Sequence, residues 1–560
     1  MNKKIVYIAL AASVVGMSSC SKKLKEFQSD FFTTNPAPLE VVGQNVPATI
    51  TGNIPAKFFV KNAKVQVTPV LVYAEGETQS GAVLIQGEKV LDNGQVVNYK
   101  QGGVVGIPFN VVYTPEMLES ELYLDFSVDQ KGKVYALPRV KVADGVLATA
   151  TLASAETVDP AIANDKFQKV VNEQQTADIM FLVNKADIRK SETGKQEYAD
   201  FNARLAAANA DPKQEIVGVN INSYASPEGE LDFNTALAEK REKSTISQVE
   251  GQLKKDNITA FGELTSSFTP EDWEGFRELV EKSNIQDKEL IISVLSMYSD
   301  PVDREREIRN LSVVFDQLAE QILPQLRYSR IEASINVFSR TNEEIAEAYK
   351  TDVKQLSVEE ILYLATLTDD NAKKMVIYNT ACEVYPNDYR CFNNLGLTQF
   401  EDGDYQAAAA NFNQAARLNP NSKEVAMNLG LISMLNKDWS KANEQLGAAA
   451  GVPEANDALG VFYLSQGDLN AAKRAFGGVK TNNAALAQIL AKDYNAASNT
   501  LNAVANPDAT TYYLKAVLAA RTNDEGAAKA NLRQAIALDN NYAARAKADK
   551  EFAKFDLSNL

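Results

Sequence analysis

A spacing of 34 residues recurs in the C-terminal third of the chain and restricts what this part can fold into. The spacing separates like residues, among them Gly396 and Gly430, Tyr405 and Trp439, Ala408 and Ala442, and Pro386 and Pro420. A repeat of this length corresponds to a helix pair that cannot bury its apolar face alone, so neighbouring copies must stack into one continuous core. The pattern predicts an all-α solenoid over residues 350–555.

The repeating unit closely resembles the tetratricopeptide repeat (TPR). Its first clear copy has small and aromatic residues at the family's positions: Phe392, Leu395, Gly396, Tyr405, Ala408, Phe412, Ala415 and Pro420. Later copies centre on Ala472, Ala497 and Ala528, and an earlier one ends at Pro386. The resemblance implies about five or six units that form a concave groove for a peptide segment or a protein partner.

Asparagines recur on the predicted inner face of this groove, at positions 393, 394, 428 and 456. A side-chain amide both donates and accepts, so these residues are candidates for hydrogen-bonding an extended backbone. The alternative is that they are solvated polar positions.

The first twenty residues predict where the protein works. Lys3 and Lys4 precede an apolar run, residues 5–17, that is too short to span a bilayer and suits a signal peptide. The run ends in Ser18-Ser19-Cys20, which resembles a bacterial lipoprotein signal. The resemblance implies that residues 1–19 are removed and that Cys20 carries three acyl chains, which together anchor a protein stably. An ordinary secretory signal is the alternative.

The residues that follow Cys20 are basic: Lys22, Lys23 and Lys25. Surface-exported lipoproteins of the Bacteroides group tend to have an acidic run there. The resemblance therefore implies an outer-membrane lipoprotein that faces the periplasm, with residues 20–34 as the lipidated cysteine and a short linker.

Composition excludes several classes of function. The formal net charge of −16 argues against general binding of nucleic acid, and the absence of histidine excludes His-based triads and His-ligated zinc. Three cysteines are too few for a four-cysteine metal site, and no metal or other cofactor is expected. Cys382 and Cys391 fall on neighbouring predicted helices of an exported chain, where they either form a disulfide or are two buried apolar residues.

Residues 35–155 show the alternation of apolar and polar residues that is typical of strands. Examples are the runs 65–73, 82–85, 104–113 and 122–128, with Gly, Asn and Asp between them. Several short strands at this spacing predict an antiparallel β-sandwich. The region has no recognisable chemical motif, so we expect a spacer or docking domain.

Residues 165–341 show a mixed α/β pattern, with strands at 179–183, 215–223 and 329–337 and helices at 195–208 and 234–254. The run Val219 to Gly229, followed by Asn234, Leu237 and Arg241, resembles the OmpA-like peptidoglycan-associated domain. The strand around Arg330-Ile-Glu332 is similar to the strand that closes the family fold. Residues 260–325 are expected to be a helical insertion.

The family site is electrostatic, and the resemblance assigns it residue by residue. A turn aspartate pairs with the diaminopimelate ammonium of peptidoglycan, and the helix arginine pairs with the carboxylate. This chain keeps Asn234 and Arg241, whereas Ser226 replaces the aspartate, and Glu228 or Glu230 is a candidate substitute. Peptidoglycan-binding candidates are therefore Ser226, Glu228, Asn234 and Arg241, with a structural role for Arg241 as the alternative.

The modules favour a non-catalytic scaffold, since no nucleotide loop, GxSxG motif or metal motif is present. The first hypothesis is a lipid-anchored envelope adaptor that binds peptidoglycan or an envelope partner through the OmpA-like domain and proteins through the repeats. The second is an accessory subunit of an outer-membrane assembly or secretion complex that does not bind the wall. The third is a surface glycan-binding lipoprotein that uses the β-sandwich.

Overall fold

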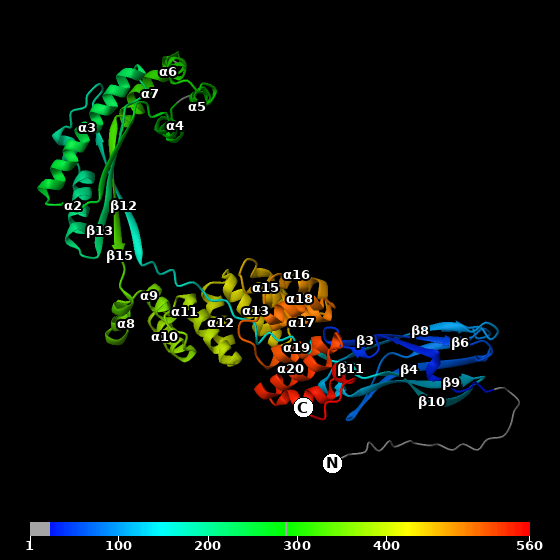
Figure 1. The fold of residues 1–560 in the computed structure, drawn as a ribbon. Coiled ribbons are helices and arrows are strands. Elements are labelled where there is room, and N and C mark those ends of the chain that lie inside the picture. The colour runs from blue at the N-terminus through cyan, green and yellow to red at the C-terminus, as the bar shows by residue number, and fades with distance from the viewer. Residues whose placement is uncertain (1–22, 286–287, 311, 560) are drawn as a thin grey trace. The chain divides into compact units, whose positions relative to one another are not determined.

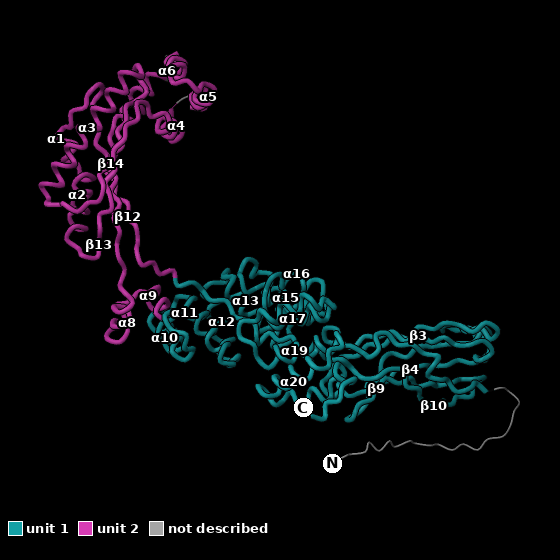
Figure 2. Tube along the Cα trace, viewed as in Figure 1, with its two compact units in different colours: residues 1–165, 365–560 teal, residues 166–364 magenta. Residues whose placement is uncertain are grey.

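The computed structural model describes residues 23–285, 288–310 and 312–559, so the expected signal peptide and Cys20 lie outside the described residues. The described chain divides into two compact units (Figure 2). One contains the chain up to residue 165 together with residues from 365 onward, and the other contains residues 166–364. The second unit is thus inserted in the sequence of the first.

The N-terminal part of the first unit is β-rich, with two sheets that share one apolar core (Figure 1). The smaller sheet has the order β1 (Phe32–Asn35), β3 (Asn45–Ile54) and β8 (Gly103–Val112). The larger has the order β10 (Lys133–Asp144), β9 (Ser120–Gln130), β4 (Ala63–Tyr73), β6 (Val83–Gly87) and β7 (Gln95–Val97), with β5 (Gly76–Gln79) paired to β4. Pairing is antiparallel except between β6 and β7, and a parallel pair joins β2 (Leu39–Glu40) to β11 (Val146–Leu147). Because alternate residues of β8 and β9 are buried, this arrangement agrees with the predicted sandwich.

The expected linker, residues 20–34, differs from the structure in the described part that begins at residue 23. Leu24 and Phe27 are buried in the core of the β domain, and the ring of Phe27 stacks on that of Phe126 at 4.4 Å. Two apolar residues three positions apart are too few to show a period, which is why the sequence did not indicate this packing. Within the described residues, the core of the β domain therefore extends back to Leu24.

The C-terminal part of the first unit is an all-helical repeat. Its helix pairs are α11 (Tyr389–Glu401) with α12 (Tyr405–Leu418), α13 (Lys423–Leu435) with α14 (Trp439–Ala448), α15 (Ala455–Ser465) with α16 (Leu469–Phe476), α17 (Asn482–Leu490) with α18 (Tyr494–Asn502), and α19 (Ala509–Arg521) with α20 (Glu525–Leu538). α10 (Asn371–Val384) precedes them and α21 (Asn541–Ala548) follows. A Cβ on Gly396 would lie 2.8 Å from the ring of Phe412, which explains the glycine at this close helix contact.

Aspartates start the second helix of every pair. Asp404, Asp438, Asp468, Asp493 and Asp524 each accept a hydrogen bond from the backbone N–H three residues on. Such caps satisfy an otherwise orphan donor and complement the helix dipole. They fix where each second helix begins and so keep the repeats in register.

The second unit is a four-stranded sheet of order β12 (Val170–Met180), β15 (Tyr328–Phe338), β13 (Gln214–Tyr224) and β14 (Glu263–Thr269). α2 (Gln196–Ala210) and α3 (Leu231–Lys255) pack on one face through Phe201, Leu205 and Val249. β14 falls inside the expected helical insertion: this edge strand is polar and mostly exposed, so it gives no apolar alternation. The helical part is α4 (Trp273–Lys282), α5 (Lys288–Met297), α6 (Pro301–Asn310) and α7 (Ser312–Gln321).

Three further helices complete the described chain: α1 (Lys190–Thr193), α8 (Asn342–Thr351) and α9 (Val358–Thr366). Within the described ranges, none of the helices combines the length and the apolar character that crossing a membrane requires.

Candidate functional site: a self-occupied peptide groove

The inner face of the helical repeats holds a segment of the chain's own backbone. Residues 154–165, which we call the strap, follow the β domain and contact helices α11, α13 and α17. The strap runs against the order of the repeats, because Ser154 meets Asn483, Ala161 meets Asn428 and Ala163 meets Asn394. The groove that the sequence predicts is therefore present, and its occupant is the same polypeptide.

Asparagine amides bind the strap through its backbone. Asn428 accepts from the Ala161 N–H at 2.7 Å and donates to the Ala161 carbonyl at 2.8 Å. Asn394 makes the same pair of bonds with Ala163, both at 2.9 Å. Asn393 donates to the Ala161 carbonyl at 3.0 Å. A donor and acceptor on one amide match the two polar groups of an extended residue, so the recognition depends on backbone and tolerates any small side chain.

The strap side chains that face the helices are small and apolar. Ala155, Val158, Ala161 and Ala163 are buried, whereas the neighbouring Ile162 is 45% exposed. Ala155, Val158 and Ala161 belong to the same apolar core as the repeat helices. Water does not reach the N–H and C=O groups of a buried backbone. The burial of the strap is therefore favourable only because the asparagine side chains bond to these groups.

An acidic side chain lies beside the strap. Asp457 of α15 is buried and accepts from the Thr481 hydroxyl at 3.0 Å. Burial, together with the charge of Asp159 on the strap, raises the pKa of Asp457 to about 6. This carboxyl is therefore poised to change its charge in mildly acidic solution.

The asparagine predictions are confirmed in three of four cases. Asn393, Asn394 and Asn428 bind backbone, whereas Asn456 is exposed on α15 and the buried neighbour Asp457 lies on the inner side. Asn483 was missed: its amide donates to the Ser154 carbonyl at 3.0 Å and accepts from the Ser154 N–H at 3.1 Å. Asn483 belongs to a shortened repeat, in which the 34-residue spacing fails.

Arg390, also missed, holds the far end of the strap. Its guanidinium donates to the Asp165 carbonyl at 2.9 Å and pairs with Asp388 at 2.7 Å. The strap is therefore fixed by side chains at both ends and in the middle.

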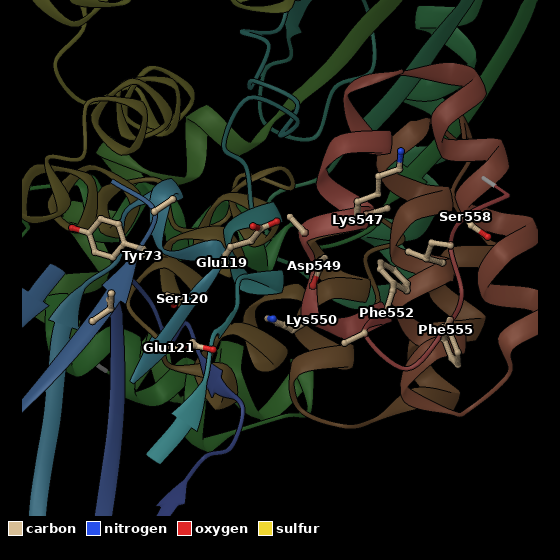
Figure 3. A pocket seen from close by; sticks show the side chains of 16 residues that line it. Tyr73, Glu119, Ser120, Glu121, Lys547, Asp549, Lys550, Phe552, Phe555 and Ser558 are labelled. Atoms are coloured by element: carbon tan, nitrogen blue, oxygen red, sulfur yellow. The ribbon is translucent and has the colours of Figure 1, made fainter. Parts of the chain in front are cut away.

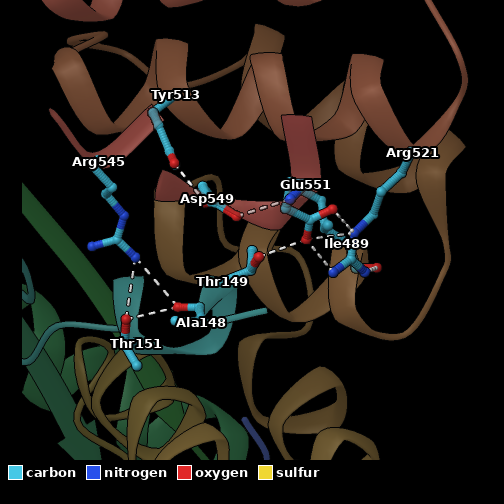
Figure 4. A network of polar contacts seen from close by, with 9 residues as sticks. All are labelled: Ala148, Thr149, Thr151, Ile489, Tyr513, Arg521, Arg545, Asp549 and Glu551. Carbon is cyan, nitrogen blue, oxygen red and sulfur yellow. Dashed lines mark hydrogen bonds and ion pairs between the residues drawn. The ribbon is translucent and has the colours of Figure 1, made fainter. Parts of the chain in front are cut away.

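The β domain is joined to the last repeats by a buried polar network just before the strap (Figure 4). Glu551 accepts from the Thr149 hydroxyl at 2.6 Å and from Arg521 Nε at 3.0 Å. Arg545 donates to the Ala148 carbonyl at 3.3 Å. Arg521 and Glu551 are 11% and 4% exposed, so this ion pair is desolvated and depends on both partners.

A cavity of about 610 Å³ opens beside this network (Figure 3). It lies between β-domain residues, such as Tyr73, Glu119 and Glu121, and the C-terminal residues Lys550 and Phe552. Its wall mixes acidic, basic and aromatic side chains. The cavity marks an incompletely packed part of the contact between the β domain and the repeats.

In the second unit the family-site candidates are bonded to one another and to the fold. Ser226 donates to Glu228 at 2.8 Å, and both Glu228 oxygens accept from Arg327 at 2.9 Å. Asn234 donates to the Gly229 carbonyl at 2.9 Å. Arg327, which precedes β15 and matches no motif, was missed as the partner of Glu228. Glu230 precedes α3 and accepts the Asn234 N–H through its carbonyl at 2.9 Å.

Arg241 is almost fully buried at 1% exposure. Its guanidinium donates to the carbonyls of Lys185, Tyr224 and Leu182 at 3.1, 2.8 and 3.3 Å. Its Cζ lies 5.1 Å from the centre of the Phe181 ring, and burial lowers its pKa to about 10, so it stays charged at neutral pH. These bonds tie α3 to the loop after β12 and to the end of β13. These contacts agree with the structural role that the sequence left as the alternative for Arg241.

Cys382 and Cys391 are both free and buried, so the structure does not contain the disulfide that the sequence left open. The thiols lie close enough for Cys382 to influence Cys391, yet both are enclosed by the packing of α10 against α11. Burial raises the pKa of Cys382 to about 12 and that of Cys391 further still. Both therefore stay protonated and unreactive at neutral pH.

No cluster of three or more Cys, Asp or Glu side chains that could hold a metal ion occurs in the part of the chain that the structure describes. The asparagines of α11, α13 and α17 bind polypeptide backbone.

Comparison with known proteins identifies the repeats. Models of the tetratricopeptide repeat match residues 389–422 and 509–542. A search of curated proteins gives no match. Among solved structures, a tetratricopeptide repeat protein from Parabacteroides merdae is 14% identical over 38% of this chain and 91% of its own, with a TM-score of 0.29.

Two further solved structures give similar values. Pseudomonas aeruginosa pilF is 17% identical over 38% of this chain and 100% of its own, with a TM-score of 0.29. YrrB, described as a TPR protein with an unusual peptide-binding site, is 18% identical over 37% of this chain and 99% of its own, with a TM-score of 0.20. The two family matches establish that the helical part of this chain contains TPR repeats, which indicate a scaffold for protein–protein interaction.

Proposed function

We propose that the chain is a non-catalytic scaffold of the bacterial cell envelope, anchored by acyl chains on Cys20 to the outer membrane and facing the periplasm. The N-terminal signal pattern supports the anchor, and the TPR repeats support the binding of proteins. Within this scaffold the OmpA-like unit binds a protein of an outer-membrane assembly or secretion complex.

The observation that carries the proposal is the occupied groove. The strap fills the surface through which TPR repeats commonly take peptides, and its asparagine bonds join the β domain to the helical repeats. In this arrangement the groove holds two parts of the same chain together, namely the β domain and the repeats. Partners then bind to other surfaces of the repeats or to the inserted unit, which the strap and the first repeat flank in sequence.

The contacts of the family-site residues favour a protein partner over peptidoglycan. Both carboxylate oxygens of Glu228 accept hydrogen bonds from Arg327, and the Arg241 guanidinium donates to three backbone carbonyls. A diaminopimelate ligand needs a carboxylate for its ammonium and a guanidinium for its carboxylate, and here both groups already have partners. Breaking the Glu228–Arg327 pair to bind a ligand would cost much of the energy gained.

Anchoring is tested by metabolic labelling with palmitate and by membrane fractionation of Cys20→Ala against the parent chain. Cys382→Ala is the matched control, because it removes a thiol and leaves the signal unchanged. Acylation that is lost only in Cys20→Ala supports the anchor. Label that persists in Cys20→Ala rejects it.

The choice between wall and protein is tested with the chain from residue 20 carrying Cys20→Ser. Co-sedimentation with purified sacculi is expected to retain no more protein than a bead control. Crosslinking in intact cells, followed by mass spectrometry, is expected to join residues of the 166–364 unit to one recurrent envelope protein. Saturable binding to sacculi that Glu228→Gln abolishes would reverse the choice in favour of peptidoglycan.

A further inference from the structure

One end of the β domain is strongly basic in a chain that is acidic overall. This end consists of residues 23–28 and the connections 55–62, 88–102 and 130–133, which lie at the same ends of strands β3, β4, β9 and β10. These four segments contain eight lysines and three acidic residues, an excess of five positive charges, whereas the whole chain has a net charge of −16. We call this surface the basic end.

Contacts show that the four segments form one continuous surface. The rings of Phe27 and Phe58 lie 5.1 Å apart, and the Lys57 N–H donates to the Tyr99 carbonyl at 2.6 Å. The Leu24 N–H donates to the Tyr135 hydroxyl at 3.2 Å, beside the hairpin of residues 130–133. At its border Lys64 adds one positive charge, and Asp30 and Asp129 add two negative charges, so the excess is four positive charges when the border is included.

The lysines of the basic end project into solvent. Seven of the eight are exposed, namely residues 23, 25, 57, 89, 100, 131 and 133, and Lys61 pairs with Glu88 at 2.8 Å. Leu91 of the basic end is completely exposed, and Val134, which follows Lys133, is 70% exposed. Exposed aliphatic side chains on a surface that is rich in lysine are typical of surfaces that meet anionic headgroups and the acyl boundary.

The position of the N-terminus points to the occupant. The described chain starts at this end, away from α19 and α20 (Figure 1). Four residue steps separate Cys20 from the buried Leu24, which limits the distance between them to about 14 Å. A membrane that holds Cys20 is thus within roughly one or two screening lengths of the lysines.

We propose that the basic end lies on the membrane surface and binds anionic phospholipid headgroups, with Leu91 entering the headgroup region. This proposal deepens the proposed function and rests on its lipid anchor for the position of the chain. The attraction between the lysines and the headgroups is a second attachment beside the acyl chains of Cys20. It holds the β domain in one orientation on the bilayer, whereas the acyl chains alone would leave the domain free to rotate.

The test uses the unacylated chain from residue 20 with Cys20→Ser, so that binding by the surface is measured without the anchor. Vesicles of phosphatidylethanolamine and phosphatidylglycerol are compared with vesicles of phosphatidylcholine alone, by co-sedimentation at low and high salt. Lys100→Gln, Lys131→Gln and Lys133→Gln together remove three positive charges from the basic end. The matched control is Lys437→Gln, Lys441→Gln and Lys547→Gln on the helical part, and circular dichroism checks the folding of both.

We expect the parent and the control to bind the anionic vesicles in a salt-sensitive way, and the basic-end variant to bind about 100-fold more weakly, since each lysine contributes roughly 1 kcal/mol at such a surface. Leu91→Ser should weaken binding by roughly tenfold. Equal binding by the basic-end variant and the control, or no preference for anionic vesicles, overturns the proposal. Palmitate labelling of Cys20 distinguishes failure of this proposal from failure of the lipid anchor. If the protein is acylated but does not bind the vesicles, only the surface proposal fails. If it binds the vesicles but is not acylated, only the anchor fails.

Discussion

The Asn428 side chain accepts the Ala161 N–H at 2.7 Å and donates to the Ala161 carbonyl at 2.8 Å, so one amide satisfies both backbone groups of a residue that water does not reach. Because Asn393 also donates to that carbonyl, the N–H is the group that depends on Asn428 alone in this arrangement. The pair makes the strap part of the core of the repeats.

Asn428→Ala should lower the free energy of unfolding of the first unit by about 1–3 kcal/mol, because the buried Ala161 N–H loses its acceptor. Urea denaturation followed by circular dichroism measures this loss. Asn456→Ala, an exposed position on α15, should change stability by less than about 0.5 kcal/mol. Equal effects of the two substitutions would contradict the role of Asn428.

Ala161→Arg should displace the strap, since residue 161 has no exposed surface and an arginine side chain does not fit against the repeat helices. Limited proteolysis is expected to cut the variant within residues 154–165, where the parent resists. Ile162→Arg is the matched control, because this neighbouring side chain is 45% exposed and points away. Cleavage of both variants at the same rate would show that the strap is not held by its buried face.

The raised pKa of Asp457 predicts a stability that decreases between pH 4 and 7. The folded chain keeps its proton up to a pKa of about 6, whereas the unfolded chain releases it near 3.8. Between these values the unfolded state binds fewer protons, so rising pH favours unfolding, by up to about 3 kcal/mol at neutral pH.

Asp457→Asn should remove this dependence, so that its stability relative to the parent increases as the pH rises from 4 to 7. Thermal unfolding at several pH values measures the difference. Asp159→Asn should shift the parent's transition to lower pH, because the charge on the strap helps to raise the Asp457 pKa. A parent and an Asp457→Asn variant that differ by the same amount at every pH would rule out the titration.

The two buried cysteines should react with a thiol reagent only after unfolding. In the chain with Cys20→Ser, native protein at pH 8 is expected to show negligible reaction, because the pKa of each thiol is raised and neither is exposed. Denaturant without reductant should then reveal two thiols per chain. Two thiols that appear only after reduction would show that the bridge left open by the sequence forms after all.

Glu551→Gln should destabilise the attachment of the β domain by about 3–5 kcal/mol, because it leaves the buried Arg521 without its counter-charge. Differential scanning calorimetry should show an earlier transition. Glu525→Gln breaks an exposed pair with Lys529 and should have an effect below about 1 kcal/mol. Matching shifts for the two variants would indicate that the network of Figure 4 does not hold the β domain.

The sequence predicted what depends on local patterns and fixed spacing. Gly396 and Gly430 placed the repeats, and Asn394 and Asn428, with the same spacing, indicated a groove that binds backbone. Strands β4 and β8 were visible because their alternate residues are buried. Each of these signals comes from residues close together in the chain or from a repeated environment.

Other features depend on contacts between distant residues and gave no signal. The strap consists mostly of small residues without a periodic pattern. Its partners lie more than 200 positions away, so the local sequence does not indicate that it is bound. Glu228 was assigned to a ligand by resemblance, and only the fold brings Arg327 against it. The polar edge strand β14 shows no alternation because neither of its faces is well buried.

The connectivity of the strap has a consequence for how the protein is made. The ribosome produces Ala163 and Thr149 long before Asn394 and Glu551, at sequence separations of 231 and 402. The strap cannot make all of its contacts until α17 has been synthesised, and contacts of such separation are slow to form. The bond between Thr149 and Glu551 can therefore form only after residue 551 has been synthesised, and a chain that stops before this residue lacks the contact.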